Sequence, residues 1–457
     1  MKRLNLIFIL ILIINCSFDN KTGIWKDESS ISIDTSKTKA LENNINKRNY
    51  EDVFLENQVF NEEKESTKNL NLKNETTSLN KNWNQEFGSN YNNVLNLGDN
   101  NKNIISSKSP KLSRFANKKN YMVRNVIIHN DNIISYDHKG KIFIYSQENK
   151  KKIFEYNFYK KNFKNYKKEI FLIANEGKIY AADNLGYIYA LDIGKKSLIW
   201  AKNFGIPFRS NMKIANDQIF VVNQENVLYS IDVNNGDKNW TFSSGLTLIN
   251  SDFKNNLVLD NLSKNIFFLN TSGELYSINY LNQKINWLLN FKNPTLTGDN
   301  DLFSSRPVVL KNDNIYVSTE KVFLSYNNIT SLKNWSLVLA PSLRPVVTND
   351  YVYIFTQKNL LICIAVKNGE VLWSKNIFKQ IKDKKFNKKV GLITSLTISN
   401  NMLNLYSRNG YLLSYDYKNG NLNFYNKISK KGIVSEIIHK DGKIFLVDKS
   451  NRLIKFN

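Results

Sequence analysis

The stretch VKNGEVLWSKN, Val366 to Asn376, decides the fold class. An Asn-Gly pair between two apolar runs is the strongest short-range signal for a β-hairpin, because both residues tolerate the positive φ of a type I′ turn. The pair therefore predicts two antiparallel strands, LLICIAV before it and VLWSKNI after it. Trp373 lies early in the second strand, four residues after Gly369.

The same phrase recurs along the chain at a nearly constant interval. Gly236 stands four residues before Trp240, and Gly420 stands four residues before Phe424. Upstream of each aromatic marker lie further alternating apolar runs separated by turn residues, so that one repeat contains four short strands. Successive markers are 38 to 51 residues apart, and they are Phe154, Trp200, Trp240, Trp287, Trp335, Trp373 and Phe424.

This period indicates a β-propeller. Four strands in every 40–50 residues or so is typical of propeller blades. The alternative is a β-sandwich with a coincidental rhythm, although sandwiches do not repeat one phrase at a fixed spacing. The bulky marker rings are expected to be structural and to pack between neighbouring blades.

Closure of the ring requires one strand from elsewhere in the chain. After Phe424 only three strands remain, and an open sheet edge would leave backbone N–H and C=O groups unpaired. The phrase LNKNWNQEF contains Trp83 and is similar to DKNWTFSS at 237–244. We therefore expect a strand around Trp83, the eighth marker, to complete the last blade, with a loop over 84–120. The predicted fold is all-β, an eight-bladed propeller of four-stranded antiparallel blades over residues 81–457.

The N-terminal sequence MKRLNLIFILILIINC has the form of an export signal. Its basic start and short apolar run predict a signal peptide over residues 1–15, too short to remain as a membrane span. The Cys that follows is similar to the lipidation site of bacterial lipoproteins, although Asn15 stands where Gly, Ala or Ser is usual. Cys16 is expected to carry the acyl chains; an ordinary Cys in a cleaved leader is the alternative. Ser17, in place of the Asp typical of inner-membrane retention, implies an outer-membrane anchor facing the periplasm.

Residues 16–80 are rich in Asn, Ser, Lys and Glu without a steady apolar period, so we expect a flexible tether there. The whole chain has a formal net charge of +24, yet acidic residues outnumber basic ones in the tether. The propeller is therefore strongly basic and is expected to attract anionic partners or an anionic membrane surface. Nucleic acid is not an expected partner, because the signal directs the chain out of the cytoplasm.

Nothing in the sequence points to catalysis. The three His residues, His129, His138 and His439, occupy unrelated positions in the repeats and do not have the spacing of a metal site. No Gly-rich phosphate loop or nucleophile elbow is present. We expect no catalytic residue, no metal and no cofactor. Cys363, inside an apolar strand, is expected to be a small core residue.

The repeats resemble those of pyrroloquinoline-quinone (PQQ) propellers. The segments Tyr189–Asp192 and Tyr229–Asp232 show the middle of that pattern, and an Asn-Gly turn with a Trp completes it. Within this group the chain is similar to the BamB lipoproteins of the outer-membrane β-barrel assembly machinery. The resemblance covers residues 81–457 together with the lipoprotein leader. It implies a scaffold without enzymatic activity whose partner is BamA, the central barrel-assembly protein, bound through its periplasmic domains.

The resemblance also implies where that partner binds. GDNDLFSSRPVV, Gly298 to Val309, matches a family loop in which an acidic pair precedes small residues and Pro. Asp299 and Asp301 would be the pair, with Leu302 beside them; a polar turn capping a strand is the alternative. A second family contact falls in SSGLTLINSDFK, where Leu246 and Leu248 keep the apolar character but the family's Arg-Gly is absent.

Two other functions stay open at this stage. PQQ-dependent dehydrogenases resemble the same repeat, but they usually carry an adjacent Cys pair, a Ca²⁺ site and a catalytic Asp; the adjacent Cys pair is absent here. The other is an anchored propeller that serves a different periplasmic partner, such as a polysaccharide or a peptidoglycan-linked factor.

Overall fold

The structure is a computed structural model of the whole chain. It describes residues 16–18, 25–27, 60–66, 70, 80–94, 97–98, 105–112, 125–137, 139–159, 163, 165–245, 253–292, 302–381, 383 and 385–456. The chain divides into two units, Met1–Gln58 and Val59–Asn457. In the first unit, β1 (Cys16–Phe18) pairs antiparallel with β2 (Trp25–Asp27). The predicted signal peptide lies outside the described residues, and the lipidation of Cys16 stays a prediction.

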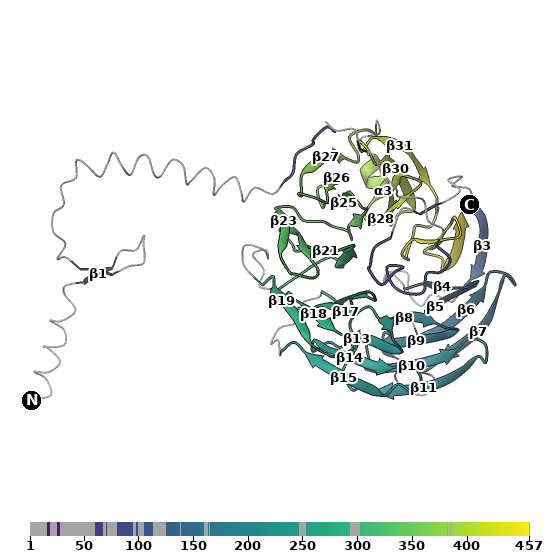
Figure 1. Cartoon of the computed structure of the whole chain (residues 1–457). Coiled ribbons are helices and arrows are strands. Elements are labelled where there is room, and N and C mark those ends of the chain that lie inside the picture. The colour runs from purple at the N-terminus through teal and green to yellow at the C-terminus, as the bar shows by residue number, and fades with distance from the viewer. Residues whose placement is uncertain are drawn as a thin grey trace, which may run out of the picture. The chain divides into compact units, whose positions relative to one another are not determined.

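The second unit is a ring of eight four-stranded antiparallel sheets (Figure 1), which confirms the predicted fold class. Each blade runs from a first strand at the channel to a fourth strand at the rim. Blades 1 to 4 contain β4 (Ile127–His129), β5 (Asn132–Tyr136), β6 (Lys141–Ser146), β7 (Lys151–Asn157); β8 (Ile170–Asn175), β9 (Lys178–Asp183), β10 (Tyr187–Asp192), β11 (Ser197–Asn203); β12 (Lys213–Ala215), β13 (Gln218–Val222), β14 (Val227–Asp232), β15 (Lys238–Ser243); and β16 (Asn256–Asp260), β17 (Asn265–Leu269), β18 (Glu274–Asn279), β19 (Ile285–Asn290).

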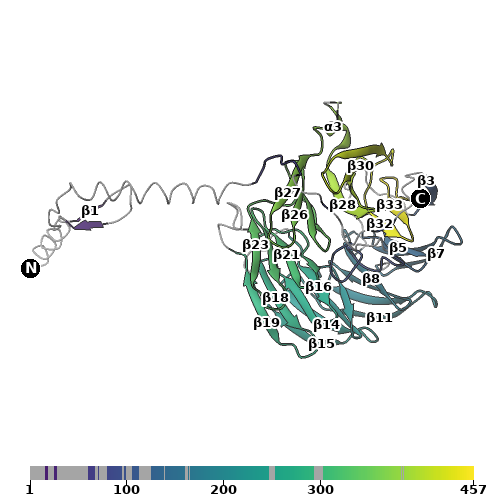
Figure 2. The same ribbon diagram turned by 45° about the horizontal axis from the view of Figure 1, so that its top comes forward.

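Blades 5 to 8 repeat this plan. They contain β20 (Val309–Lys311), β21 (Asn314–Ser318), β22 (Phe323–Asn327), β23 (Lys333–Leu337); β24 (Val346–Val347), β25 (Tyr351–Phe355), β26 (Leu360–Ala365), β27 (Val371–Asn376); β28 (Ile393–Ser399), β29 (Met402–Ser407), β30 (Tyr411–Asp416), β31 (Leu422–Lys427); and β32 (Ile438–Lys440), β33 (Lys443–Val447), β34 (Arg452–Phe456), β3 (Ile105–Lys111). The one described helix, α3 (Phe386–Val390), lies between blades 6 and 7 and projects beyond them in Figure 2.

The antiparallel order gives the ring two distinct faces. We call the face with the connections between successive blades the loop face, and the opposite face, which carries the first and third turns of each blade, the turn face. Apolar clusters fill the spaces between adjacent blades, as in the cluster of blades 5 and 6 around Tyr316, Val352 and Ile362. The core is therefore divided among the blade interfaces and does not lie at the axis.

An N-terminal strand closes the ring, but the prediction of its position was wrong. The fourth strand of blade 8 is β3, which pairs with β34 from Ile105–Phe456 to Lys111–Arg452. Trp83 lies instead at the centre of the ring, where it exchanges backbone hydrogen bonds of 2.8 Å with Ile128 of β4. The similarity of the Trp83 phrase to the marker phrase was misleading, because β3 contains no aromatic residue and its Ser- and Lys-rich sequence has no strand signal.

The repeated Gly and Trp contact each other across the blade interfaces. The indole Nε1 of Trp335 in blade 5 donates to the backbone oxygen of Val366 in blade 6, at 2.8 Å. The turn that contains Val366 also contains Gly369, where a Cβ would lie 2.8 Å from the Trp335 ring. The same close approach joins Gly236 to Trp200 and Gly420 to Trp373. The Gly of each such turn therefore packs against the Trp ring of the preceding blade. The Trp that follows the Gly in sequence packs against the turn of the next blade.

The turn itself differs from the predicted type I′ geometry. Gly369 has a φ of +74°, and Asn368 does not share a positive φ. The Gly369 N–H donates to the oxygen of Ala365, which closes a five-residue turn. The Trp335 ring covers this turn, so the tertiary contact selects a longer connection than the Asn-Gly pair alone indicates.

The segment 60–66, predicted as part of the tether, lies along the outer edge of blade 6. Lys64 exchanges backbone hydrogen bonds of 2.9 Å with Ser374 of β27. Glu63 accepts from the backbone N–H of Asn376, and its carboxylate pairs with Lys379. The hydrogen bond from Lys379, together with that from the Asn376 N–H, lowers the pKa of Glu63 below its ordinary value. Lysines on blade 6 thus bind the acidic residues of this segment and cover one strand edge of the ring.

We predict that Trp373→Ala destabilises the full chain by about 3–5 kcal/mol, as for other fully buried aromatic side chains. Trp373 is completely buried, and its Nε1 donates to the backbone oxygen of Tyr417 in the next blade. Trp240→Ala is the matched control, because Trp240 has the same place in blade 3 but is only partly buried and bonds to Gln218 of its own blade. Denaturant unfolding followed by circular dichroism measures both changes, and equal losses for the two variants would contradict the inter-blade role.

Candidate functional site

The central channel holds a segment of the N-terminal region. We call residues 80–94 together with Leu97 the plug. It enters and leaves at the turn face, where Asn80 and Leu97 bond to Asp441 and Asn400 in the first turns of blades 8 and 7. Figure 1 shows it crossing the middle of the ring. The sequence did not predict this plug, because it indicated a blade strand around Trp83 and a long loop over 84–120.

The plug bonds to the first strand, or to the residues beside it, in every blade. The backbone oxygens of Asn84, Asn90 and Tyr91 accept from the first strands of blades 2, 4 and 5 at 2.8 to 3.0 Å. The Asn93 side chain donates to and accepts from the Val347 backbone of blade 6. One ring partner from each blade, in blade order, is Ile128, Ala174, Lys213, Leu259, Leu310, Val347, Ile398 and Asp441. The plug therefore pairs backbone groups that would otherwise face an open channel.

Lys213 anchors the plug by filling all three of its hydrogen-bond positions. Its Nζ donates to Gln85 Oε1 at 3.2 Å, to the Ser89 backbone oxygen at 2.8 Å and to Asn92 Oδ1 at 2.7 Å. Burial lowers the pKa of Lys213 to about 7, and the Glu86 and Glu436 carboxylates oppose that shift.

Further charged groups surround the same point. Burial raises the pKa of Glu86 to about 7, and repulsion from Glu436 adds to the shift. The Arg344 guanidinium donates to the Asn92 backbone oxygen and lies over the Phe87 ring, 5.4 Å from its centroid. Two carboxylates thus face two cations around the plug, which balances charge inside a strongly basic propeller.

Two local features fix the course of the plug. Gly88 has a φ of +75°, and a Cβ there would lie 2.8 Å from the Trp83 ring, so only Gly allows the chain to fold back over this indole. His129 Nε2 accepts from the Gly177 backbone N–H, so its Nδ1 carries the proton that is shared with Asn84 Oδ1 at 3.0 Å. Burial lowers the pKa of His129, which favours this neutral form.

Of the residues that the family resemblance implied for partner binding, the structure describes Leu302, which lies on the loop face. Leu246, Leu248, Asp299 and Asp301 lie outside the described residues, and their partner-binding role stays a prediction. Leu302 is described and is 41% exposed. Its neighbour Phe303 is buried and meets Phe253 of the preceding loop edge to face, with ring centroids 5.6 Å apart. The structure therefore joins the bases of the two predicted contact loops, which enter blades 4 and 5.

The described residues can be compared with the geometry of metal sites and of membrane-spanning helices. Within those ranges, no group of three or more His, Cys, Asp or Glu side chains is placed to hold a metal ion. None of the described helical residues belongs to a helix with the length and apolar character of a bilayer span. Cys363 is fully buried in β26, as expected of a small core residue.

The fold and the repeats define the class of protein: the chain is an eight-bladed β-propeller built from PQQ-like repeats. Residues 160–375 and 337–457 match the family of the outer membrane protein assembly factor BamB. Since these segments cover more than half of the sequence, the chain belongs to the BamB family. The plug and the closing strand β3 precede the matched residues.

Individual relatives agree with this assignment. The assembly factor BamB of Moranella endobia (strain PCIT) is 20% identical over 290 residues, 58% of this chain and 69% of that protein. The crystal structure of BamB from Moraxella catarrhalis covers 76% of this chain and 98% of its own, with a TM-score of 0.58 and 12% identity. A quinohemoprotein alcohol dehydrogenase from Pseudomonas putida HK5 also superposes with a TM-score of 0.58 at 8% identity, over 82% of this chain and 80% of that one. These structural likenesses show the fold alone.

We predict that Lys213→Met loosens the plug and destabilises the full chain by about 3 kcal/mol, because three acceptors lose their donor and one of them, Asn92 Oδ1, is fully buried. Lys178→Met is the control: this lysine makes an exposed hydrogen bond with Asn234 at the start of β9, on the turn face. Limited proteolysis between residues 80 and 97, together with denaturant unfolding, measures the effect. Unchanged protease resistance in Lys213→Met would show that the ring holds the plug without this anchor.

Proposed function

We propose that the chain is a non-enzymatic scaffold of the outer-membrane β-barrel assembly machinery. In this proposal, acylated Cys16 holds it at the periplasmic face of the outer membrane, and its loop face binds the periplasmic domains of a BamA-like barrel-assembly protein. Membership of the BamB family supports the assembly role. The observation that carries the docking site is the junction of two inter-blade loops at Phe253 and Phe303, with Leu302 exposed beside it.

The junction has the properties of a modest docking site. Phe303 is buried against Gly273, where a Cβ would lie 2.7 Å from its ring, so the base of the loop is rigid. A closely packed base presents the exposed Leu302 at a defined place, which lowers the entropic cost of binding. Apolar contacts at the centre and charged residues at the edge are the usual composition of such interfaces.

The second candidate function is that of a PQQ-dependent dehydrogenase, which is suggested by the structural neighbours. The plug favours the scaffold function over this alternative. Propeller blades surround a central channel. Here Trp83, Asn92 and Asn93 occupy that channel and bond to the surrounding strands. A planar cofactor at the axis on the turn-face side would have to displace the plug and its hydrogen bonds.

We predict that a photoreactive amino acid at position 302 captures the barrel-assembly protein in cells. The control carries the same probe at position 281, since Leu281 is also exposed but lies in the third turn of blade 4, on the opposite face. Mass spectrometry of the crosslinked products identifies the partner. Capture of another protein at 302, with the chain still at the outer membrane, would move the function to a different periplasmic partner.

Charge reversal of Asp299 and Asp301 to Lys is expected to weaken partner binding about tenfold, since two exposed charge contacts together supply roughly 1.4 kcal/mol. The melting temperature should stay unchanged. Asp350→Lys is the control, because Asp350 is exposed on the turn face of blade 6. Binding is measured with the purified periplasmic domains, and melting by circular dichroism. A fall in melting temperature would mean that the acidic pair caps a strand.

A further inference from the structure

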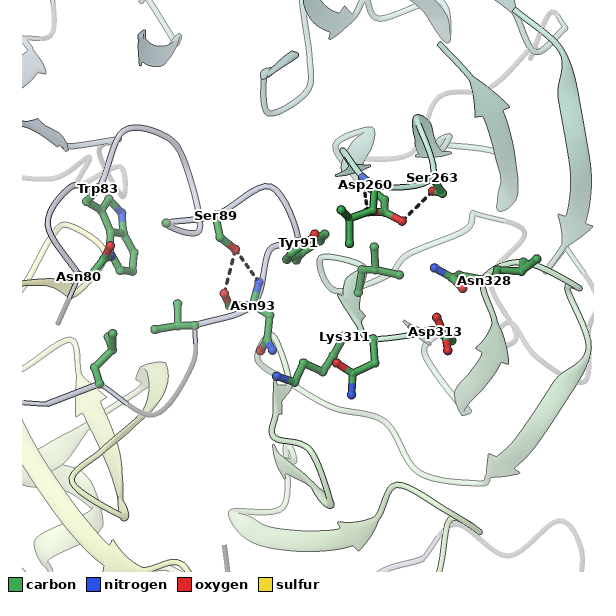
Figure 3. A pocket seen from close by; sticks show the side chains of 17 residues that line it. Asn80, Trp83, Ser89, Tyr91, Asn93, Asp260, Ser263, Lys311, Asp313 and Asn328 are labelled. Atoms are coloured by element: carbon green, nitrogen blue, oxygen red, sulfur yellow. Dashed lines mark hydrogen bonds between the residues drawn. The ribbon is translucent and has the colours of Figure 1, made fainter. Parts of the chain in front are cut away.

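The turn face contains a cavity of about 650 Å³ between the plug and blades 4 and 5. The plug forms one wall, and the opposite wall comes from the first turn of blade 4 and the first and third turns of blade 5. Figure 3 shows Trp83 at one end, Asn328 at the other and Tyr91 between them, so the cavity is elongated. Its volume is within the usual range of ligand sites.

Apolar side chains line the cavity and also stand exposed at its mouth. Trp83, Val94 and Leu97 of the plug are buried in its wall. Leu262 and Ile329, which line the same cavity, are 88% and 64% exposed. Large apolar residues with this exposure on two adjoining turns indicate a contact surface.

Two buried polar atoms in residues of this lining have no hydrogen-bond partner in the described structure. They are the Trp83 Nε1 donor and the Asn328 Oδ1 acceptor, in residues that are 2% and 3% exposed. Buried polar atoms are normally paired, so these two are exceptions in the lining and could accept a partner from a bound ligand. A donor and an acceptor at opposite ends of an elongated cavity match the C=O and N–H groups of an extended polypeptide.

The charge at the mouth differs from the rest of the propeller. Asp313 is exposed there, and Asp260 lies beside it in the lining, with its carboxylate bonded to Ser263 and to the Leu262 N–H. Lys311 is the one described cation of the lining. A local excess of carboxylate within a chain of net charge +24 favours a ligand that carries Lys or Arg.

We propose that this cavity binds an extended, unfolded polypeptide segment that presents an apolar side chain next to a Lys or Arg. The apolar side chain packs between Leu262 and Ile329, the cation faces Asp313, and backbone groups bond to Trp83 and Asn328. The site goes beyond the proposed scaffold function and does not depend on it, because it lies on the opposite face from the loop-face junction.

The test uses the full chain and a fluorescein-labelled nonapeptide, Gly-Lys-Val-Thr-Leu-Thr-Val-Lys-Gly, in fluorescence polarisation. Saturable one-to-one binding is expected, with at least ~10-fold weaker binding of the peptide in which both Lys are replaced by Glu. Ile329→Glu and Leu262→Glu should each weaken binding at least ~10-fold, and Asp313→Lys should reverse the preference between the two peptides.

Matched variants separate the site from general effects. Leu392→Glu introduces the same charge at a 66% exposed Leu between blades 6 and 7 and should leave binding unchanged. Asn328→Leu removes the unpaired acceptor and should weaken binding without lowering the melting temperature. Absence of saturable binding, or equal binding by all variants, would overturn the proposal. The proposal would also be overturned if the chain did not bind the peptide but bound phosphatidylglycerol vesicles through Leu262 and Ile329. In that case these turns would contact lipid.

Discussion

The first strands of the eight blades present their backbone edges to one central channel. The N–H and C=O groups of these edges need hydrogen-bond partners, and the rest of the structure depends on how they are supplied. The plug satisfies these edges from within, since its described residues bond to every blade. Asn, Gln and Ser side chains suit this course, because each offers donors or acceptors to strands that approach from different directions. Lys213 and Arg344 add charged donors, which hold the plug where neutral hydrogen bonds alone would be weaker.

The plug also separates the two faces of the ring. On the loop face, two inter-blade connections meet at Phe253 and Phe303, and our proposal puts the partner contacts there. On the turn face, the plug and the turns of blades 4 and 5 enclose a cavity with unpaired polar atoms. A scaffold with different chemistry on its two faces can hold a stable partner on one side and a transient segment on the other.

Much of the fold could be predicted from local sequence. The Asn-Gly phrase around Gly369 and Trp373 marked the blades, because a tight turn and a buried aromatic ring are required at the same place in each repeat. Trp83 could not be placed in the same way. Its phrase has the composition of a fourth strand, but β3 already fills that position, and β3 has no apolar alternation that would reveal it.

The candidate sites depended still more on tertiary contacts. The run of amide residues from Asn82 to Asn93 was the signal for the plug, but amides are equally common in solvated loops, so the signal was ambiguous. The cavity joins the plug to turns that lie more than 160 residues away in the sequence. No local pattern encodes such a pairing.

The sequence by itself determined the class of fold, the number of blades and the aromatic residues between them, because each of these follows from a repeated local pattern. The tertiary structure decided which N-terminal segment closes the ring, which segment fills the channel, and which polar atoms remain without a partner. Those outcomes depend on how distant segments compete for the same strand edges, and that competition is settled only when the ring closes.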